Sequence, residues 1–248
     1  MDLGLQGRRA AVAAASGGLG FASAKSLADE GVRVVICGRD RGRIEAAAAE
    51  IGHGCIGLVH DVSDAAGGAA FVAAATEALG GLDIVVANGG GPPPGTFAST
   101  PVDVYDTALD LSLLSVVGMA KAAIPAMQAQ RWGRFVAITS VSVRQPIPTL
   151  ILSNTARAGV TGFLKTVARE VASDGVTVNS VQPGLHATDR VTSLYGGDTA
   201  AVAAGVPAGV LGQASDFGAI VAFVCSEQAK YVTGLQLHVD GGSYAGLQ

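Results

Sequence analysis

Short apolar or β-branched runs alternate along this chain with longer segments in which apolar residues recur at a period near 3.6. The short runs predict strands over residues 9–14, 32–37, 55–59, 82–87, 133–139, 176–181 and 235–239. The periodic segments predict helices over residues 21–30, 41–51, 69–79, 102–130, 153–173 and 215–225. Alternating strands and helices with right-handed crossovers form a parallel, doubly wound sheet. We therefore predict a single α/β domain over residues 1–248, with helices on both faces of a sheet of about seven strands.

The segment 188–213 carries no strand pattern and is rich in small residues. Loops of this length inside a compact domain usually have a function. We therefore expect this segment to act as a lid over a binding site.

The composition supports a buried sheet and argues against several classes of function. Hydrophobic residues make up 49% of the chain and charged residues 15%, which suits a sheet covered on both faces. The net charge is −4 and no run of Lys or Arg occurs, which argues against a nucleic-acid partner. Cys37, Cys55 and Cys225 lack the spacing of zinc ligands, so we interpret them as buried thiols and predict no metal site. We expect a cytoplasmic protein, because no signal peptide is visible and no apolar run reaches about 18 residues.

A glycine-rich turn follows the first predicted strand and leads directly into a helix. The stretch is "AAASGGLG", and its candidate cofactor residues are Ser16, Gly17, Gly18, Leu19 and Gly20. Small residues let the backbone approach a pyrophosphate, and a helix N-terminus offers N–H groups to it. A strand, a glycine turn and a helix in this order are typical of a Rossmann-type dinucleotide site. The alternative is a turn that only begins a helix.

The end of the second predicted strand indicates which dinucleotide binds. An acidic residue there would accept hydrogen bonds from a ribose 2′-hydroxyl, whereas an arginine would bind a 2′-phosphate. Gly38 and Arg39 occupy this place, and Asp40 follows, where we expect it to point elsewhere. A guanidinium makes bidentate contacts with phosphate, so the sequence favours NADP over NAD. The alternative for Arg39 is a solvated loop charge.

From about residue 5 to residue 243, the chain resembles the short-chain dehydrogenase/reductase family, and it is similar to the 3-oxoacyl-carrier-protein reductases. The glycine turn corresponds to the family's TGxxxGxG, with Ala13 and Ala14 in place of the threonine and the first glycine. Further matches are "HDV", "ANGGG", "AITS", "VNSVQPG" and "YVTGLQLHVDGG", in the family's order. The resemblance implies contacts with the cofactor for Asp61, Val62, Asn88, Gly89, Gly90, Pro183, Gly184 and Thr188.

The resemblance also implies a catalytic set that is unusual for the family. Ser140 corresponds to the catalytic serine, whereas Ser153, Arg157 and Ser112 stand where the family has tyrosine, lysine and asparagine. Ser153 and Arg157 are four residues apart, so they share one face of a helix. The implied activity is hydride transfer between a nicotinamide and a carbonyl or alcohol substrate.

The substitution of serine for tyrosine affects the proton that this reaction needs. A serine hydroxyl is a far weaker acid than a phenol, so Ser153 can donate a hydrogen bond but is a poor proton source. His186 and Tyr195 are alternative proton donors. The other interpretation of His186 is an exposed loop histidine, and that of Tyr195 is a residue that packs within the lid. A protein that binds the nucleotide with little turnover, as a sensor or assembly partner, stays open, as does epimerisation or dehydration on the same fold.

Two other features have a functional and a structural interpretation. Arg144 would bind an anionic substrate or form a loop salt bridge. The proline-rich loop "GGGPPPGTF", residues 89–97, would be a stiff wall beside the substrate or a rigid connector.

The two longest predicted helices suggest self-association. They carry more apolar surface than one sheet face can bury, through Val116, Val117, Met119, Phe163, Leu164 and Val167. We expect a homo-oligomer, either a tetramer or a dimer, whose other partner is a small-molecule substrate.

Overall fold

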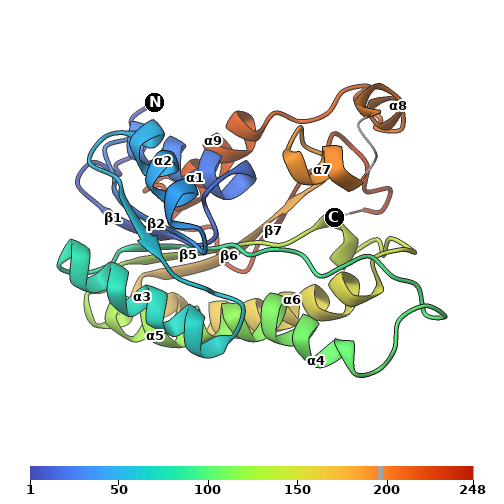
Figure 1. The fold of residues 1–248 in the computed structure, drawn as a ribbon. Helices are drawn as coiled ribbons and strands as arrows, with labels where there is room; N and C mark the ends of the chain where they lie inside the picture. Colours follow the sequence, from blue (N-terminus) through green and yellow to red (C-terminus); the bar gives the residue numbers. More distant parts are fainter. Residues whose placement is uncertain (195–197, 248) are drawn as a thin grey trace.

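The computed structural model describes residues 1–194 and 198–247, apart from the side chains of Arg190 and Leu194. Within these residues, one parallel sheet holds its strands in the order β3-β2-β1-β4-β5-β6-β7 (Figure 1). The strands are β1 (Arg9–Val12), β2 (Arg33–Gly38), β3 (Ile56–Val59), β4 (Ile84–Ala87), β5 (Gly133–Ile138), β6 (Val176–Pro183) and β7 (Gln236–Val239). The predicted α/β fold and its seven predicted strands are confirmed.

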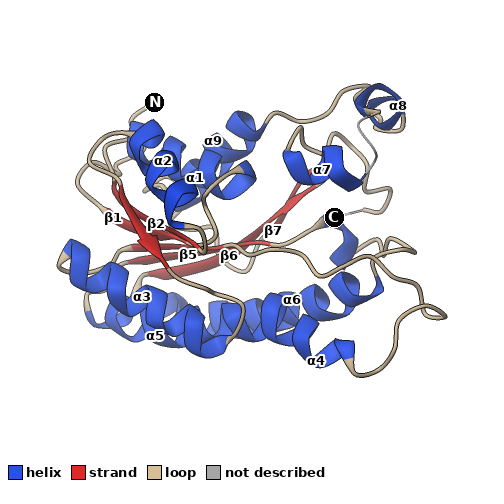
Figure 2. Cartoon of the chain, viewed as in Figure 1, coloured by secondary structure: helices blue, strands red, loops and turns tan. Residues whose placement is uncertain are grey.

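Helices cover both faces of the sheet (Figure 2). One layer contains α1 (Gly18–Asp29), α2 (Arg41–Ile51) and α9 (Ala214–Cys225). The other contains α3 (Ala65–Leu79), α4 (Val104–Leu109), α5 (Ser115–Ala129) and α6 (Ile151–Val171). Successive side chains of a strand point to opposite faces, so Ile84 and Val86 of β4 pack in the α1 layer, and Val85 and Ala87 in the α3 layer. This is why the strands read as continuous apolar runs.

The strand order reverses at the junction of β1 and β4. From β1 the chain builds outward through β2 and β3, then returns to β4 on the other side of β1. The loops that follow β1 and β4 therefore run in opposite directions and leave a crevice at the carboxyl ends of the strands. The glycine turn follows β1 and Asn88 follows β4, so the sequence motifs converge there.

The predicted helix over residues 102–130 contains a π-helical turn, η1 (Asp110–Leu114), between α4 and α5. Such turns frequently mark functional sites. Contrary to our expectation, the stretch Val104–Ala129 is long and apolar enough to span a membrane by length and composition. Half of its apolar window is buried inside the protein, as in the core helix of a folded domain. Two 3-10 turns, η2 (Val141–Val143) and η3 (Ala172–Asp174), flank α6.

The prediction of a plain loop over residues 188–213 is wrong, because two short helices lie there. These are α7 (Asp189–Leu194) and α8 (Thr199–Ala204). The carboxylate of Asp198 accepts the N–H of Ala201 at 3.0 Å and so begins α8. Helices of six residues have too few turns to show an apolar period, which is why the pattern missed them.

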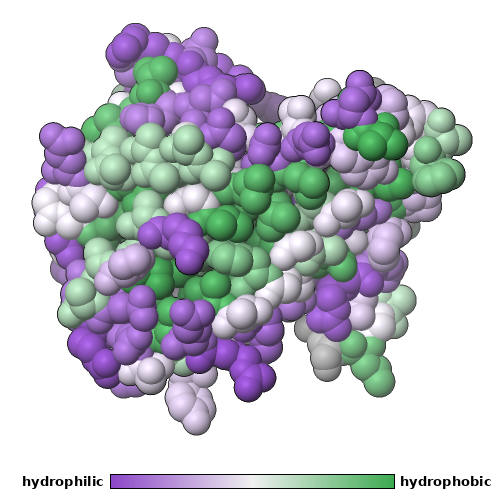
Figure 3. All heavy atoms as spheres, turned by 90° about the horizontal axis from the view of Figure 1, so that it is seen from below, coloured by the Kyte–Doolittle hydropathy of each residue, from purple (hydrophilic) through white to green (hydrophobic). Residues whose placement is uncertain are grey.

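Hydrophobic side chains gather on the outer face of the layer that contains α5 and α6 (Figure 3). The six apolar residues that the sequence analysis assigned to surplus surface on these helices fall into two groups. Val116, Met119 and Leu164 are buried in the protein's own core, so for these three the predicted surplus is wrong. Phe163 and Val167 are only partly buried, as is Val117, and Leu114 is 40% exposed. The remaining apolar surface is therefore narrower than the sequence suggested.

Candidate functional site

A cavity of about 970 Å³ opens at the crevice, within the size range of cofactor sites. Most of the predicted site residues line it, namely Ser16, Gly17, Gly18, Leu19, Arg39, Asp61, Val62, Asn88, Gly89, Gly90, Ser140, Ser153, Arg157, Pro183, Gly184 and Thr188. Two predicted residues, Gly20 and Ser112, are not part of this lining. One continuous space thus joins the glycine turn to the serines that follow β5 and begin α6.

The glycine turn has the geometry of a phosphate cradle. Gly17 begins α1 without a side-chain cap, which leaves N–H groups of the first turn for an anion, and Gly18 has a left-handed φ of 60°. A Cβ on Gly20 would lie 2.6 Å from Asn88 Nδ2 and 2.9 Å from the Ala14 carbonyl oxygen, so only glycine fits. The side chain of Asn88 donates to the carbonyls of Ala13 and Ala14 at 3.2 and 3.1 Å. These bonds fasten the turn to the end of β4.

The ribose end of the cavity presents cations and no carboxylate at the end of β2. A Cβ on Gly38 would lie 3.3 Å from Ile44 Cδ1, a tight contact that Ile44 would have to shift to accommodate. Asp40 points elsewhere, as predicted, because its Oδ1 accepts the N–H of Arg43 at 2.8 Å and caps α2. Arg39 is exposed and lines the cavity, and Arg43 lines it too. The sequence reasoning missed Arg43, although its place one helical turn after Arg39 could have indicated it.

Farther along the sheet edge, the residues that follow β3 complete this end of the cavity. Asp61 Oδ1 accepts the N–H of Ser63 at 3.0 Å, and the neighbouring Val62 is buried. His60 also lines the cavity. The cofactor fits these residues, because the turn, the cations and this edge lie along one space.

At the other end of the cavity, two serines and an arginine come from β5 and α6. Ser140 Oγ accepts the N–H of Ser142 at 3.1 Å, which uses a lone pair and leaves the hydroxyl able to donate. Ser153 is 93% buried but borders the cavity. Arg157 donates to the carbonyls of Ile138 and Thr139 at 3.0 and 3.2 Å. Arg157 therefore ties α6 to the end of β5, directly before Ser140.

Residues 13–244 match the family described as Enoyl-(Acyl carrier protein) reductase. The 3-oxoacyl-[acyl-carrier-protein] reductases FabG of Vibrio cholerae and Escherichia coli are each 35% identical to the chain over 242 residues, covering 98% of the chain and 99% of each relative. The chain belongs to the short-chain dehydrogenase/reductase family. Its membership confirms the resemblance seen in the sequence and supports an oxidoreductase function.

Solved structures of the short-chain dehydrogenase/reductase family have the same architecture. YwfH, an NADPH-dependent reductase involved in bacilysin biosynthesis, is 28% identical with a TM-score of 0.93, covering 98% of this chain and all of that one. L-sorbose reductase from Gluconobacter frateurii, solved with NADPH and L-sorbose, is 29% identical with a TM-score of 0.92 over the full length of both chains. The chain thus shares its fold with an NADPH-dependent reductase and with a reductase solved in complex with NADPH.

In this short-chain dehydrogenase/reductase, Ser112 is not among the residues that line the cavity. It belongs to the π-helical turn η1 and is buried, and its hydroxyl has no hydrogen-bond partner among the described residues. Its neighbour Leu111 lines the cavity instead. A direct contact of the Ser112 hydroxyl with the substrate, as the resemblance implied, is therefore not seen in the lining of the cavity.

Of the two proton donors suggested from the sequence, the structure describes His186 but not Tyr195. His186 is buried, so its interpretation as an exposed loop histidine is wrong, and it lines the cavity. Its Nδ1 lies 3.3 Å from the Gly184 carbonyl oxygen, and its ring meets Phe217 edge-on at 5.2 Å. Burial lowers the pKa of His186, so the neutral imidazole, a poor acid, prevails at neutral pH. Tyr195 lies outside the described residues.

For two loops beside the cavity, the structure favours the structural interpretation over the functional one. Arg144 is exposed and is absent from the cavity lining, and its guanidinium lies 5.4 Å from the centre of the Tyr244 ring. In the proline-rich loop, the prolines are also absent from the lining. Gly95 donates to the Thr149 carbonyl at 2.7 Å and accepts from the Ile151 N–H at 3.2 Å. This loop therefore connects to and holds the start of α6.

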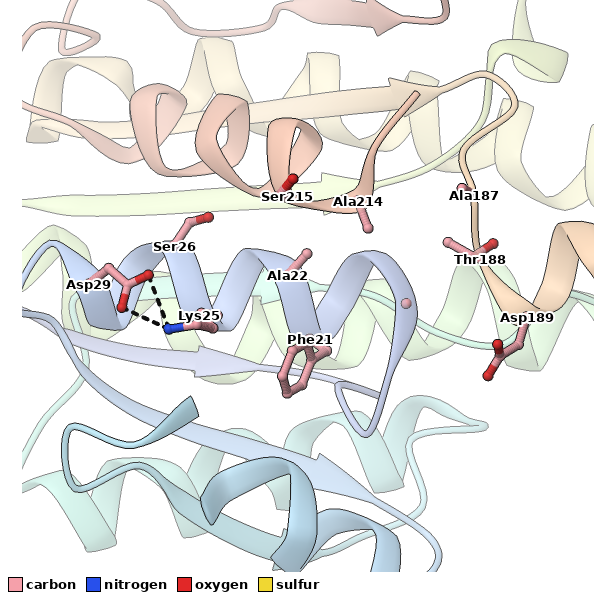
Figure 4. A pocket seen from close by; sticks show the side chains of 11 residues that line it. Phe21, Ala22, Lys25, Ser26, Asp29, Ala187, Thr188, Asp189, Ala214 and Ser215 are labelled. Atoms are coloured by element: carbon pink, nitrogen blue, oxygen red, sulfur yellow. Dashed lines mark hydrogen bonds and ion pairs between the residues drawn. The ribbon is translucent and has the colours of Figure 1, made fainter. Parts of the chain in front are cut away.

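A smaller cavity of about 380 Å³ lies beside α1 (Figure 4). Gly18, Thr188 and Asp189 line both cavities, so the smaller one borders the cofactor end. Its other charged side chains, Lys25 and Asp29, form an ion pair at 3.0 Å. Because Lys25 and Asp29 neutralise each other, this pair does not give the small cavity a charged ligand site separate from the large cavity.

Residues of the C-terminal tail also line the large cavity. They are Ser243 and Tyr244, which follow β7, together with Gln145 from the loop after β5. The sequence reasoning did not select them. The end of β7 at the binding edge of the sheet was a general signal, but it does not indicate that the following tail folds back onto the cavity.

Proposed function

We propose that this protein is an NADPH-dependent reductase that transfers a hydride between the nicotinamide and a carbonyl or alcohol substrate. One observation carries the proposal: a single cavity has a phosphate cradle and two arginines at one end and Ser140 with Arg157 at the other. The 3-oxoacyl-[acyl-carrier-protein] reductases among its relatives and its NADPH-dependent neighbours support this assignment.

The preference for NADPH over NADH rests on charge. Arg39 and Arg43 border the ribose end, and the carboxylate of Asp40 caps α2 instead of facing the ribose. A 2′-phosphate would receive charge-assisted hydrogen bonds from the two guanidinium groups. A 2′-hydroxyl would find no carboxylate at the end of β2.

The residues at the other end of the cavity suit a carbonyl substrate. When bound, the cofactor supplies the hydride. The hydroxyl of Ser140 donates a hydrogen bond to the carbonyl oxygen, and the fixed positive charge of Arg157 favours the negative charge that develops there. Ser153 offers a second hydrogen-bond donor from α6. None of these three groups is a strong proton source.

We further propose that the described parts of the segment 188–213 cover the substrate as a lid on a single domain. Val191, Gly205 and Pro207 from this segment line the cavity. We also propose a homo-oligomer, because the outer face of α5 and α6 retains an apolar strip. The cytoplasmic location stays a prediction. A tetramer fits a family that pairs these helices about a two-fold axis.

Loss of NADPH absorbance with a panel of aldehydes, aliphatic ketones and 3-oxoacyl thioesters tests the proposed function. We expect turnover with at least one class, and a loss of about 100-fold in kcat/KM for Ser140→Ala. Tight NADPH binding without oxidation for any carbonyl would instead favour a nucleotide-binding protein with no turnover.

A further inference from the structure

The tail that follows β7 brings a phenol to the substrate end of the cavity. Tyr244 lines the same cavity as Ser140 and Ser153. Its neighbour Ala245 donates its N–H to Gln145 Oε1 at 3.0 Å. Gln145 stands in the loop that starts at Ser140, so this bond draws the tail against the catalytic loop.

Several contacts fix the position of this tail. Asp240 accepts the N–H groups of Gly242 and Tyr244 at 2.9 and 2.8 Å. Gly241 and Gly242 have φ values of 63° and 84°, which allow the sharp turn that these bonds require. The Tyr244 ring stacks on His238 of β7, with 4.5 Å between the ring centres and 13° between the planes. The Tyr244 ring is thus held at the cavity wall, with its hydroxyl beside Gly246 of the tail.

Other ionisable side chains that line the cavity are poor candidates for a proton donor. Among the described residues these are Arg39, Arg43, His60, Asp61, Arg157, His186 and Asp189. Arginine keeps its proton near neutral pH, and a carboxyl group is ordinarily ionised there. His60 and Asp61 follow β3, four strand spacings or about 19 Å from the end of β5. His186 is held as the neutral imidazole by burial.

We propose that Tyr244 gives its proton to the substrate oxygen, the role that the serine at position 153 cannot fill. This inference rests on the proposed function. As the hydride adds to the carbonyl carbon, the electron pair of the C=O π bond moves to oxygen, and that oxygen takes the proton of the Tyr244 hydroxyl. The remaining phenolate is stabilised by the Arg144 guanidinium, whose Cζ lies 5.4 Å from the centre of the ring, and it recovers a proton from water.

Tyr244→Phe removes the hydroxyl and keeps the ring that stacks on His238. We expect kcat to fall about 100-fold or more, with the NADPH dissociation constant and the melting temperature unchanged. Tyr231→Phe is the matched control, because Tyr231 is 97% exposed and does not line the cavity, and it should keep full activity.

A spectroscopic measurement separates a proton donor from a structural ring. In the unreactive complex with NADP⁺ and a ketone, infrared spectroscopy reads the hydrogen bonds to the carbonyl oxygen directly. The C=O stretch should rise in Tyr244→Phe and stay unchanged in Tyr231→Phe. Turnover and a stretching frequency that survive the loss of the hydroxyl would overturn this inference alone. A wild-type protein that binds NADPH but reduces no carbonyl would overturn the proposed function, and this inference with it.

Discussion

Arg39 follows β2 directly and Arg43 lies in the first turn of α2, and both border the cavity. We propose that both bind the ribose 2′-phosphate of NADPH. Arg41 lies between them but pairs with Glu45 at 3.4 Å and is absent from the cavity lining. Arg41 is therefore an internal control: it is an arginine in the same segment that does not border the cavity.

Arg39→Ala and Arg43→Ala should each weaken NADPH binding about ten- to 100-fold, since a hydrogen bond to a charged group is lost. NADH binding should change less than about threefold, because NADH lacks the 2′-phosphate. Fluorescence titration with both nucleotides measures the ratio, and Arg41→Ala serves as the control. Equal losses for the two nucleotides would remove the basis for NADPH selectivity.

Ala14 occupies the place of the family's first glycine and has a left-handed φ of 48°. This conformation costs an alanine roughly 1–2 kcal/mol, whereas glycine adopts it freely. Ala14→Gly should therefore stabilise the fold by about 0.5–1 kcal/mol, after the extra entropy of the unfolded glycine is subtracted. Urea unfolding measures the change. Ala15 is a buried neighbour whose φ lies outside the left-handed region, so Ala15→Gly should destabilise the fold. Changes in unfolding free energy of the same sign for both variants would contradict backbone strain at Ala14.

At the scale of elements, the sequence predicted the sheet from its short apolar runs and six helices from their apolar period. The π-helical turn inside the long helix was not predictable, since the insertion depends on local bonds such as that from Ser115 Oγ to the Leu111 carbonyl at 2.7 Å. The short helices α7 and α8 lacked a full period. Their positions depend on caps such as Asp198, which a periodicity analysis does not weigh.

Arg9 and Asp83 join the starts of β1 and β4. Arg9 Nε and one terminal nitrogen donate to the Asp83 carboxylate at 2.8 and 2.9 Å. Burial alone would raise the pKa of Asp83, but the hydrogen bonds and charge of Arg9 outweigh it and lower the pKa. A lowered carboxyl pKa stabilises the fold above the unfolded pKa of about 3.9, and this stabilisation is lost as the pH falls through the folded value.

Asp83→Asn should therefore lower the free energy of unfolding at pH 7 by about 2–4 kcal/mol, because Arg9 loses its partner. The wild type should lose this advantage as the pH falls below about 4. Urea unfolding at pH 7, 5 and 3.5 measures it. Asp29→Asn, which breaks the exposed pair with Lys25, should cost under about 1 kcal/mol at every pH. A constant difference between Asp83→Asn and wild type across this range would exclude the linkage.

For the whole molecule, the site was only partly readable from the sequence. The motifs identified the residues that follow β1, β4, β5 and β6, because strand ends meet at one edge of a parallel sheet. Arg43 and Tyr244 were missed, since neither belongs to a motif. Tyr244 reaches the cavity only through the folded tail and its bond to Gln145. Contacts between distant segments of this kind need the coordinates.

The apolar strip on α5 and α6 predicts association of copies in solution. Phe163, Val117 and Val167 are only partly buried within one chain, and a second copy would cover them. Light scattering should give a tetramer for the wild type and smaller species for Phe163→Glu. Phe97→Glu, at an 88% exposed position in the proline-rich loop, should leave the mass unchanged. A wild-type monomer at micromolar concentration would contradict the proposed assembly.

Transfer of deuterium tests the central claim of a hydride-transferring reductase most directly. The protein is incubated with NADPH deuterated at the transferring C4 position and with the carbonyl compound that is consumed fastest. Mass spectrometry of the alcohol should find one deuterium on the new carbinol carbon for each NADPH oxidised. An alcohol without deuterium, or no alcohol from any carbonyl despite tight NADPH binding, would contradict the account.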